Sequence, residues 1–340
     1  MNSNRGVSAS VAALTALLFF LSFLSGCVNV DENVPRVITG EEETEQAIHD
    51  RKVINPERQA VEMQIRLYFK HEFADFLVPS MRTVQKGKQS LEELVVEELL
   101  KGPAKFGRIC IMPPNVKLLD VIRKDETVFV NLSEAFKGET DVTVLPGKQN
   151  LAEDVKPVVL AEMKRLAIYS IVNSLTEISG VQQVKILINN RSISYGDLGL
   201  GPLIAGLANV TPDSAVMPLS RNSRFILNPT QVVHEVFTGF ADELNWDRAY
   251  SFLAETDIDG EKIPAFEQFM EMYTAYISEI AFEIKGEEIR HDGTAFVTAD
   301  FSITYANGER REKVSYNLRV VNEEGIWKLI FPEFLLRPEN

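Results

Sequence analysis

The N-terminal run that ends in Leu24-Ser25-Gly26-Cys27 says more about the compartment and anchoring of this 340-residue chain than any other feature. The stretch from Val11 to Leu24 is almost wholly apolar and follows a single positive charge at Arg5. It falls short of the about 18 apolar residues that a membrane-spanning helix needs. The small residues Ser25 and Gly26 leave the backbone unhindered for a peptidase. We therefore predict an export signal over residues 1–26, cleaved before Cys27.

This tetrapeptide resembles the lipobox of bacterial lipoproteins. The resemblance implies lipid on the sulfur and the α-amine of Cys27, with Leu24, Ser25 and Gly26 forming the recognition sequence. Each buried CH₂ contributes about 0.8 kcal/mol, so two or more acyl chains hold a protein stably on a membrane. We expect attachment to the extracytoplasmic face of the cell membrane. An ordinary signal peptide and an uncleaved anchor are the alternatives.

The charge of the chain restricts its partners. Removal of residues 1–26 takes away Arg5 and shifts the formal net charge from −14 to −15. Such a surface repels phosphate backbones, so nucleic acid is not an expected partner. It also gives no electrostatic attraction to anionic headgroups, which leaves membrane attachment to the lipid.

With Cys27 consumed by lipid, Cys110 is the other cysteine, and no intrachain disulfide is expected. Its apolar neighbours Ile109 and Ile111 predict a small buried hydrophobe rather than a reactive thiol.

Shifts in composition predict five segments. Residues 27–60, which carry Glu41-Glu42-Glu43, are predicted to be an acidic flexible tether with an r.m.s. reach of roughly 30 Å. Two folded domains are predicted at 61–195 and 229–340, after the signal peptide and on either side of a linker at 196–228. The linker contains Gly196 to Gly201 in the order G-x-x-G-x-G, which is the wrong order for a dinucleotide loop.

The first domain is predicted to be α+β, with helices on a small sheet. Ser90 and Glu93 form a capping box that begins a helix, and Gly102-Pro103 ends it. Apolar periodicity predicts a second, long helix from Pro157 to Ile178. Strands are predicted at 64–69, 76–84, 116–123, 127–133 and 184–188.

Successive blocks of this region resemble those of a GerMN domain. In order they are Leu99–Pro103, Pro113–Leu119, Val130–Phe136 and Ile171–Glu177, followed by Gly180-Val181. The resemblance spans roughly residues 63–195 and implies an exported, non-enzymatic domain, named for sporulation and spore-germination proteins. Such domains are similar to the ring-building modules of envelope assemblies and bring no catalytic residues. The insertion from Gly138 to Val155 is longer than the pattern needs.

The C-terminal domain is predicted to place three helices before a strand meander. Helices are expected at 230–244, 247–254 and 265–280, and strands at 281–290, 295–305, 310–321 and 327–334. Asp292-Gly293 and Asn307-Gly308 mark hairpin turns. The element order predicts a curved antiparallel sheet wrapped over helices and resembles the cone of nuclear-transport-factor-type or SnoaL-like domains.

Isolated polar residues give weak signals for a site. His49, His71, His234 and His291 lack metal-ligand spacing and are interpreted as surface or capping residues. The segment from Asp257 to Glu261 resembles a calcium loop, but its glycine comes too early, and a turn is favoured. The pairs Glu97-Glu98 and Glu287-Glu288 are interpreted as solvated faces.

One aromatic cluster could line a ligand cavity in the cone. Its members are Phe252, Phe266, Phe269, Met270, Tyr273 and Tyr276. A filled hydrophobic core is the favoured alternative. If the cavity is open, Asp300 or Asp257 would be the acid–base candidate.

These observations predict a non-enzymatic binding and assembly role, without cofactor or metal. The expected partners are the membrane, through the lipid, and envelope proteins or a second copy of the chain. A small-molecule sensor or carrier using the C-terminal cone is the first alternative. An isomerase-type enzyme is the second.

Overall fold

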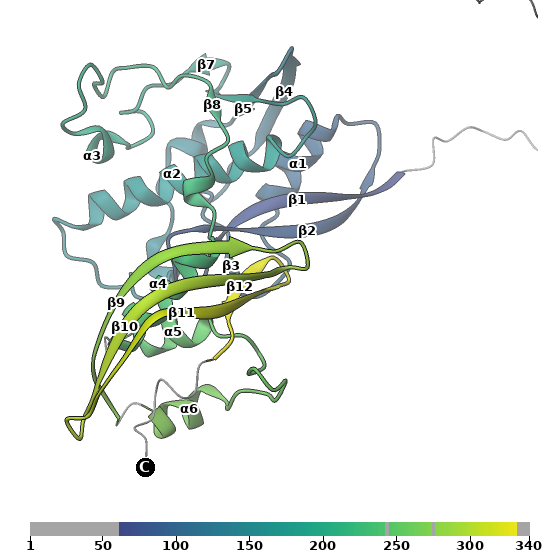
Figure 1. Ribbon diagram of the computed structural model, residues 1–340. Coiled ribbons are helices and arrows are strands. Elements are labelled where there is room, and N and C mark those ends of the chain that lie inside the picture. The colour runs from purple at the N-terminus through teal and green to yellow at the C-terminus, as the bar shows by residue number, and fades with distance from the viewer. Residues whose placement is uncertain (1–60, 242–244, 274–275, 332–340) are drawn as a thin grey trace, which may run out of the picture. The chain divides into compact units, whose positions relative to one another are not determined.

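The computed structural model describes residues 61–241, 245–273 and 276–331 (Figure 1). All of them belong to a compact unit that spans Glu57–Asn340. We call residues 61–226 the N-terminal lobe and residues 227–331 the C-terminal lobe; their folding as independent domains stays a prediction. Leu24, Ser25, Gly26, Cys27, His49 and the tether lie outside the described residues. Within the described ranges, no helix combines the length and apolar character needed to cross a membrane.

The N-terminal lobe begins with a long hairpin. Strand β1 (Val61–His71) pairs antiparallel with β2 (Leu77–Lys86), and the end of β1 also pairs with the short β3 (Arg108–Ile109). Helix α1 (Leu91–Leu100) follows, and the predicted capping box is confirmed. Ser90 Oγ accepts from the Glu93 N–H at 3.0 Å, and the Glu93 carboxylate accepts from the Ser90 N–H at 2.9 Å.

A second, mixed sheet completes the lobe. Strand β4 (Leu118–Lys124) pairs antiparallel with β5 (Thr127–Leu132), which pairs in parallel with β6 (Gln183–Ile188). Helix α2 (Lys156–Leu175) supplies the connection that a parallel pair requires. Two short strands, β7 (Arg191–Ser192) and β8 (Leu219–Ser220), add to β6. Apolar residues of α1, α2, β1, β5 and β6 share one buried cluster.

Two segments outside these regular elements also fold into the lobe. Residues 196–228, predicted to be a linker, contain α3 (Gly201–Ile204), β8 and η3 (Ser223–Phe225), and bury Leu198, Leu200 and Val216. The insertion follows η1 (Glu134–Lys137) and contains η2 (Val142–Val144). It is tied to α2 by Lys164, whose Nζ donates to the Phe136 and Gly138 carbonyls at 2.5 and 2.6 Å.

The C-terminal lobe has helices first and strands second, as predicted. The helices are α4 (Pro229–Ala241), α5 (Trp246–Ser251) and α6 (Phe266–Tyr273). The strands β9 (Ile277–Ile289), β10 (Thr294–Tyr305), β11 (Arg310–Glu323) and β12 (Ile326–Leu329) form a curled antiparallel meander (Figure 1). The third helix is shorter than predicted, because Ile277 already pairs with Tyr305 in the sheet.

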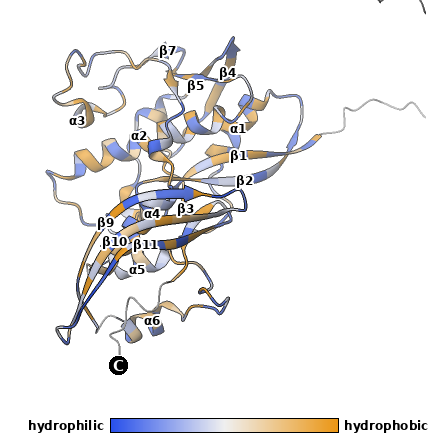
Figure 2. Cartoon of the chain, in the orientation of Figure 1, coloured by the Kyte–Doolittle hydropathy of each residue, from blue (hydrophilic) through white to orange (hydrophobic). Residues whose placement is uncertain are grey.

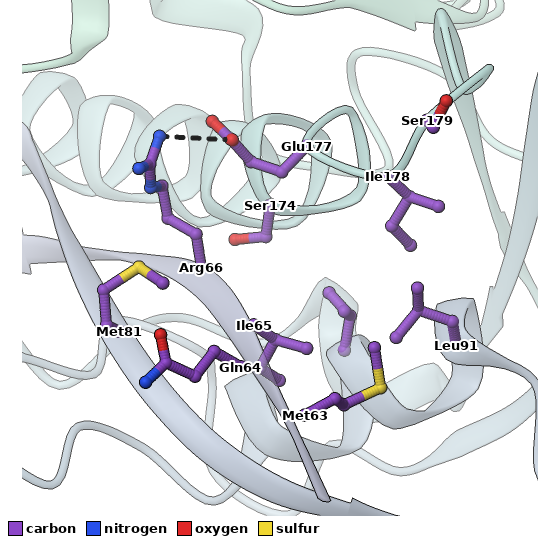
Figure 3. A pocket seen from close by; sticks show the side chains of 11 residues that line it. Met63, Gln64, Ile65, Arg66, Met81, Leu91, Ser174, Glu177, Ile178 and Ser179 are labelled. Carbon is purple, nitrogen blue, oxygen red and sulfur yellow. Dashed lines mark hydrogen bonds and ion pairs between the residues drawn. The ribbon is translucent and has the colours of Figure 1, made fainter. Parts of the chain in front are cut away.

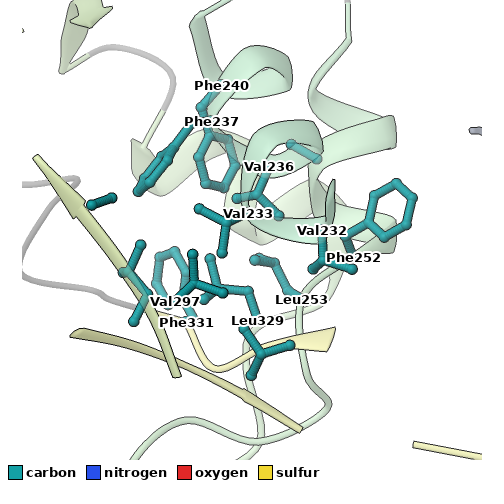
Figure 4. Packing of buried hydrophobic residues seen from close by; sticks show 14 of the residues in the cluster. Val232, Val233, Val236, Phe237, Phe240, Phe252, Leu253, Val297, Leu329 and Phe331 are labelled. Atoms are coloured by element: carbon teal, nitrogen blue, oxygen red, sulfur yellow. The ribbon is translucent and has the colours of Figure 1, made fainter. Parts of the chain in front are cut away.

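The sheet of the C-terminal lobe buries one face. Ala295, Val297 and Ala299 of β10 are buried in the core, and the residues between them are only partly buried, so burial alternates along the strand. Figure 2 shows both hydrophilic and hydrophobic stretches on the strands of this sheet. Valine and phenylalanine side chains of α4, including Val232, Val233, Val236 and Phe237, pack against this face (Figure 4). The α+β fold class predicted from the sequence is confirmed.

The two lobes are joined around the turn between β1 and β2. The His71 ring stacks on Phe252 at a centroid distance of 4.3 Å. Arg108 Nη2 donates to the carbonyls of Glu324 at 2.5 Å and Pro79 at 3.0 Å. Ala74 and Val78 belong to the same buried cluster as α4. These contacts form the joint between the lobes, and they hold the hairpin at the end where β1 turns into β2.

Candidate functional site

A cleft of about 300 Å³ lies beside the other end of the hairpin (Figure 3). Its floor is the first half of β1, with Met81 contributed by β2. Leu91 and Val95 of α1 form one wall. The end of α2 and the residues after it form the other; the contributors are Ser174, Glu177, Ile178 and Ser179.

The backbone of β1 changes partners along its length. Beyond the middle of the strand, the Tyr68 N–H donates to Ser174 Oγ at 2.9 Å, and Ser170 Oγ donates to the Tyr68 carbonyl at 2.5 Å. Lys70 pairs with Ile109 of β3 on the same side. The even-numbered residues of β1 therefore turn their backbone groups away from β2, because these directions alternate along a strand. Pro79, which has no N–H, sits opposite Tyr68 and fits this register.

The same alternation leaves the first half of β1 with an open edge. The N–H and C=O groups of Glu62, Gln64 and Arg66 face away from β2, but β3 reaches only the last two residues of the strand. No other element among the described residues hydrogen-bonds to these backbone groups. An unpaired strand edge is a template for a further strand. The cleft therefore combines side-chain walls with free backbone donors and acceptors.

A polar network lies along one side of the cleft. The Glu177 carboxylate accepts from the Tyr68 hydroxyl at 2.7 Å and pairs with Arg221 at 2.7 Å and Arg66 at 3.3 Å. Burial of the Tyr68 ring, and then its hydrogen bond to Glu177, raise the pKa of the phenol. The Arg66 side chain is 48% exposed, so its guanidinium keeps donors for a ligand.

The wall after α2 is held by Arg123 of β4. Its guanidinium donates to the Ser179 carbonyl at 3.2 Å and pairs with Glu92 of α1 at 3.1 Å. Gly180 follows with a φ of +76°, and a Cβ there would lie 2.6 Å from Arg123 Nη2. The positive φ favours a glycine here, and a Cβ at this position would displace the end of the Arg123 side chain. The wall is thus positioned by α1, β4 and a single turn.

The predicted aromatic cluster lies in the C-terminal lobe, away from this cleft. Phe252, Phe269 and Tyr273 are buried, Phe266 is partly buried, and Tyr276 is 41% exposed. The Phe269 ring contacts those of Tyr273 and Phe331 at 4.8 and 5.0 Å. This packing is what the filled-core alternative predicts, and a ligand cavity here stays a prediction.

The two acid–base candidates have structural partners. Asp300 accepts from the Ser315 N–H at 2.7 Å and pairs with Lys285 at 3.3 Å, and these contacts lower the pKa of its carboxyl. An isomerase-type base needs a raised pKa in an apolar pocket, which Asp300 lacks. Asp257 Oδ1 accepts from the N–H groups of Asp259 and Glu261, both at 2.9 Å, as in the predicted turn.

Some polar residues differ from their predictions. His71 is buried rather than on the surface, although it does cap a turn: its Nδ1 accepts from the Phe73 and Ala74 N–H groups at 3.3 Å. Glu98 is buried and pairs with Arg82 at 2.8 Å, so the solvated interpretation was wrong for this residue, whereas Glu97, Glu287 and Glu288 are exposed as predicted. In the described part of the chain, no three His, Cys, Asp or Glu side chains form a set that could hold a metal. Cys110 is half-buried, and burial raises the pKa of its thiol.

Comparison with known proteins agrees with the predicted resemblance. Residues 66–194 match the family model Germane, described as "Sporulation and spore germination". This match confirms the resemblance of the N-terminal lobe to GerMN domains. No curated protein matches the chain.

Three solved structures are similar to parts of it. The tandem GerMN domains of the sporulation protein GerM from Bacillus subtilis are 17% identical over 52% of this chain and 51% of theirs, with a TM-score of 0.32. The chain thus spans about half the length of that structure. The first GerMN domain of the same protein is 20% identical over 47% of this chain and 98% of its own, with a TM-score of 0.29. A protein from Clostridium perfringens described as a predicted lipoprotein is 18% identical over 49% and 94%, with a TM-score of 0.25.

Proposed function

We propose that this chain, whose residues 66–194 match the Germane family, is a lipid-anchored, non-enzymatic assembly protein of the cell envelope in sporulation or spore germination. It binds a partner strand in the cleft at the open edge of β1. One observation carries the proposal: the matched stretch supplies both walls of the cleft and part of its floor, since Arg66, Ser174 and Glu177 lie within it, and residues 63–65 directly before the match complete the floor.

The chemistry of the cleft favours binding over catalysis. Glu177 is its central carboxylate, and it already interacts with Tyr68, Arg66 and Arg221. These contacts already engage both oxygens of the carboxylate, which suits a structural role in the wall of the cleft. Free backbone groups beside apolar side chains such as Met63 and Ile65 instead suit an extended peptide, which gains affinity from main-chain hydrogen bonds.

The anchor rests on the sequence motif at Cys27. Lipid on this residue would hold the folded lobes near the membrane, where partners are confined to a layer. The Cys27→Ser variant is expected to be released in soluble form with unchanged thermal unfolding. Retention of this variant in carbonate-washed membranes would contradict the anchor.

The binding role is tested by complementation of a deletion strain of a sporulating host. Gln64→Pro removes an N–H on the open edge of β1, whereas Thr83→Pro is its matched control on the outer edge of β2, directly opposite in the hairpin. We expect Gln64→Pro to lose heat-resistant spores or germination and Thr83→Pro to retain them. A deletion that leaves sporulation and germination intact would refute the role.

A further inference from the structure

The five residues along the open edge of β1 are self-complementary. They read Glu62-Met63-Gln64-Ile65-Arg66. When this segment pairs antiparallel with itself about Gln64, Glu62 faces Arg66 and Met63 faces Ile65. Opposite charges therefore meet at both ends, and apolar side chains meet between them.

The backbone register agrees with this pairing. Residues that face each other across a two-fold axis at Gln64 are both even-numbered or both odd-numbered. The even-numbered residues turn their N–H and C=O groups toward the open edge, so the pair at Gln64 and the two charged pairs would each exchange two hydrogen bonds. The odd-numbered side chains, Met63 and Ile65, lie beside Leu91 and Val95 on the apolar side of the cleft.

We propose that the strand bound in the cleft is β1 of a second copy of this chain, paired antiparallel about Gln64. The contact is isologous, which is the form that two-fold dimers take. It joins two hairpins into one continuous sheet of four long strands. Arg66, already half exposed beside Glu177, is available to pair with Glu62 of the other copy. This inference names the partner within the assembly role proposed above and rests on it.

The outer edge of β2 is a poorer candidate. At its inner end the Leu77 carbonyl accepts from the Leu227 N–H at 2.9 Å, so that part is already occupied. Pairing of its outer end about Thr83 would place Met81 opposite Gln85 and Arg82 opposite Val84. No opposite charges meet in that arrangement. Charge complementarity therefore distinguishes the two edges of the same hairpin.

Cysteine cross-linking tests the contact directly. In the proposed dimer the two Gln64 Cα atoms would lie about 5.5 Å apart, within disulfide range. Thr83 pairs with Gln64 across the hairpin and is likewise exposed, but it lies one strand farther from the axis, out of disulfide range. In oxidised membranes that contain the full chain, we expect Gln64→Cys to form a disulfide dimer and Thr83→Cys to remain monomeric.

A charge swap tests the register. Glu62→Arg and Arg66→Glu each place like charges opposite one another twice in the dimer, so either change in the Gln64→Cys chain should slow cross-linking about tenfold. The double variant Glu62→Arg/Arg66→Glu restores both opposite-charge pairs, and we expect a rate within about twofold of the parent. Loss of the Arg66–Glu177 pair is common to Arg66→Glu and the double variant, so rescue cannot come from that pair.

Thermal unfolding of each variant identifies any that fail to fold. Equal cross-linking at positions 64 and 83, no cross-linking at position 64, or no rescue by the charge swap would overturn the proposal. Cross-linking of Gln64→Cys to a different protein would also overturn it, but would leave the assembly role standing. A deletion without phenotype, with the disulfide dimer intact, would refute the role and leave the contact.

Discussion

The two halves of β1 have the same hydrogen-bonding capacity but different surroundings. Around Tyr68 and Lys70, the edge that faces away from β2 is covered by two serines of α2 and by β3. From Glu62 to Arg66 the same edge faces an open cleft. The covered half is part of the joint between the lobes, and the open half is free to bind. Under the proposed function, a single strand thus serves both stability and recognition.

Proline substitution in β1 is expected to give the largest effect, because its cost depends on whether the N–H that it removes faces β2 or the open cleft. The Ile65 N–H faces β2, so Ile65→Pro removes a ladder bond and a buried side chain. We expect it to lower the free energy of unfolding by about 3 kcal/mol or more, since loss of a buried isoleucine side chain alone costs about 2–5 kcal/mol. Gln64→Pro removes only an edge N–H and should cost less than about 1 kcal/mol. Urea unfolding followed by circular dichroism measures both, and equal losses would show that the assigned register is wrong.

The next largest expected effect is the loss of the serine hydroxyls that hydrogen-bond to the Tyr68 backbone. Ser174→Ala leaves the buried Tyr68 N–H without its acceptor, and Ser170→Ala leaves the carbonyl without its donor. Each change should lower the free energy of unfolding by about 1–3 kcal/mol. Gln64→Ala, at the open edge, is the control and should stay within about 0.5 kcal/mol of the parent. Serine variants as stable as that control would mean that the covered edge is not sealed by α2.

The dependence of stability on alkaline pH distinguishes the two cationic side chains of β1, Lys70 and Arg66. Burial lowers the pKa of Lys70 to about 8, so in the folded state it loses its proton before an unfolded lysine does. The unfolded chain binds more protons between about pH 8 and pH 10.4, and stability therefore rises with pH across that window, by up to about 3 kcal/mol. Lys70→Met should remove the part of this rise that comes from Lys70, whereas burial also lowers the pKa of Lys164, which should keep its own part in both Lys70→Met and Arg66→Met. Denaturant unfolding at pH 8, 9 and 10 measures the difference from the parent.

The smallest expected effect is a loss of stability at acidic pH, which comes from His71. Burial first, and then Lys328, Lys70, Arg108 and Arg248, hold the pKa of this imidazole well below its usual range. Below about pH 6.5 the unfolded histidine binds a proton that the folded one does not, so stability falls as the pH falls.

The expected loss from this histidine is about 1 kcal/mol between pH 7 and pH 5.5. His71→Gln cannot titrate and should flatten that part of the curve. The open half of β1 contains no histidine and provides no matching loss. An unchanged slope in His71→Gln would assign the acid sensitivity to other groups.

Local patterns predicted much of this fold. The capping box at Ser90 and the turns at Gly293 and Gly308 follow from a few adjacent residues, and the structure has them. The end of the third helix did not follow, because pairing of Ile277 with Tyr305 outweighs the local helical preference. Residues 196–228 look like a linker by composition, yet apolar side chains such as Leu200 pack them into the lobe.

The cleft could be predicted only in part. The blocks that resemble a GerMN domain include Glu177 and Gly180, so sequence located one wall. Whether a strand edge is open depends on contacts distant in the chain: Ser170 and Tyr68 are 102 residues apart. No local signal at residues 62–66 shows that β3 stops after two residues. The alternation of Met63 and Ile65 with polar neighbours was the one available hint.

The Arg108 contact affects which amino-acid substitutions this chain can tolerate. Its guanidinium binds the carbonyls of Pro79, Phe106 and Glu324, all of which are backbone groups. Every residue type carries such a carbonyl, so substitutions at positions 79, 106 and 324 that preserve the local backbone leave the contact in place. For this contact only the arginine side chain must be retained. Mutation can therefore vary the residues at positions 79, 106 and 324 while the contact between the lobes persists.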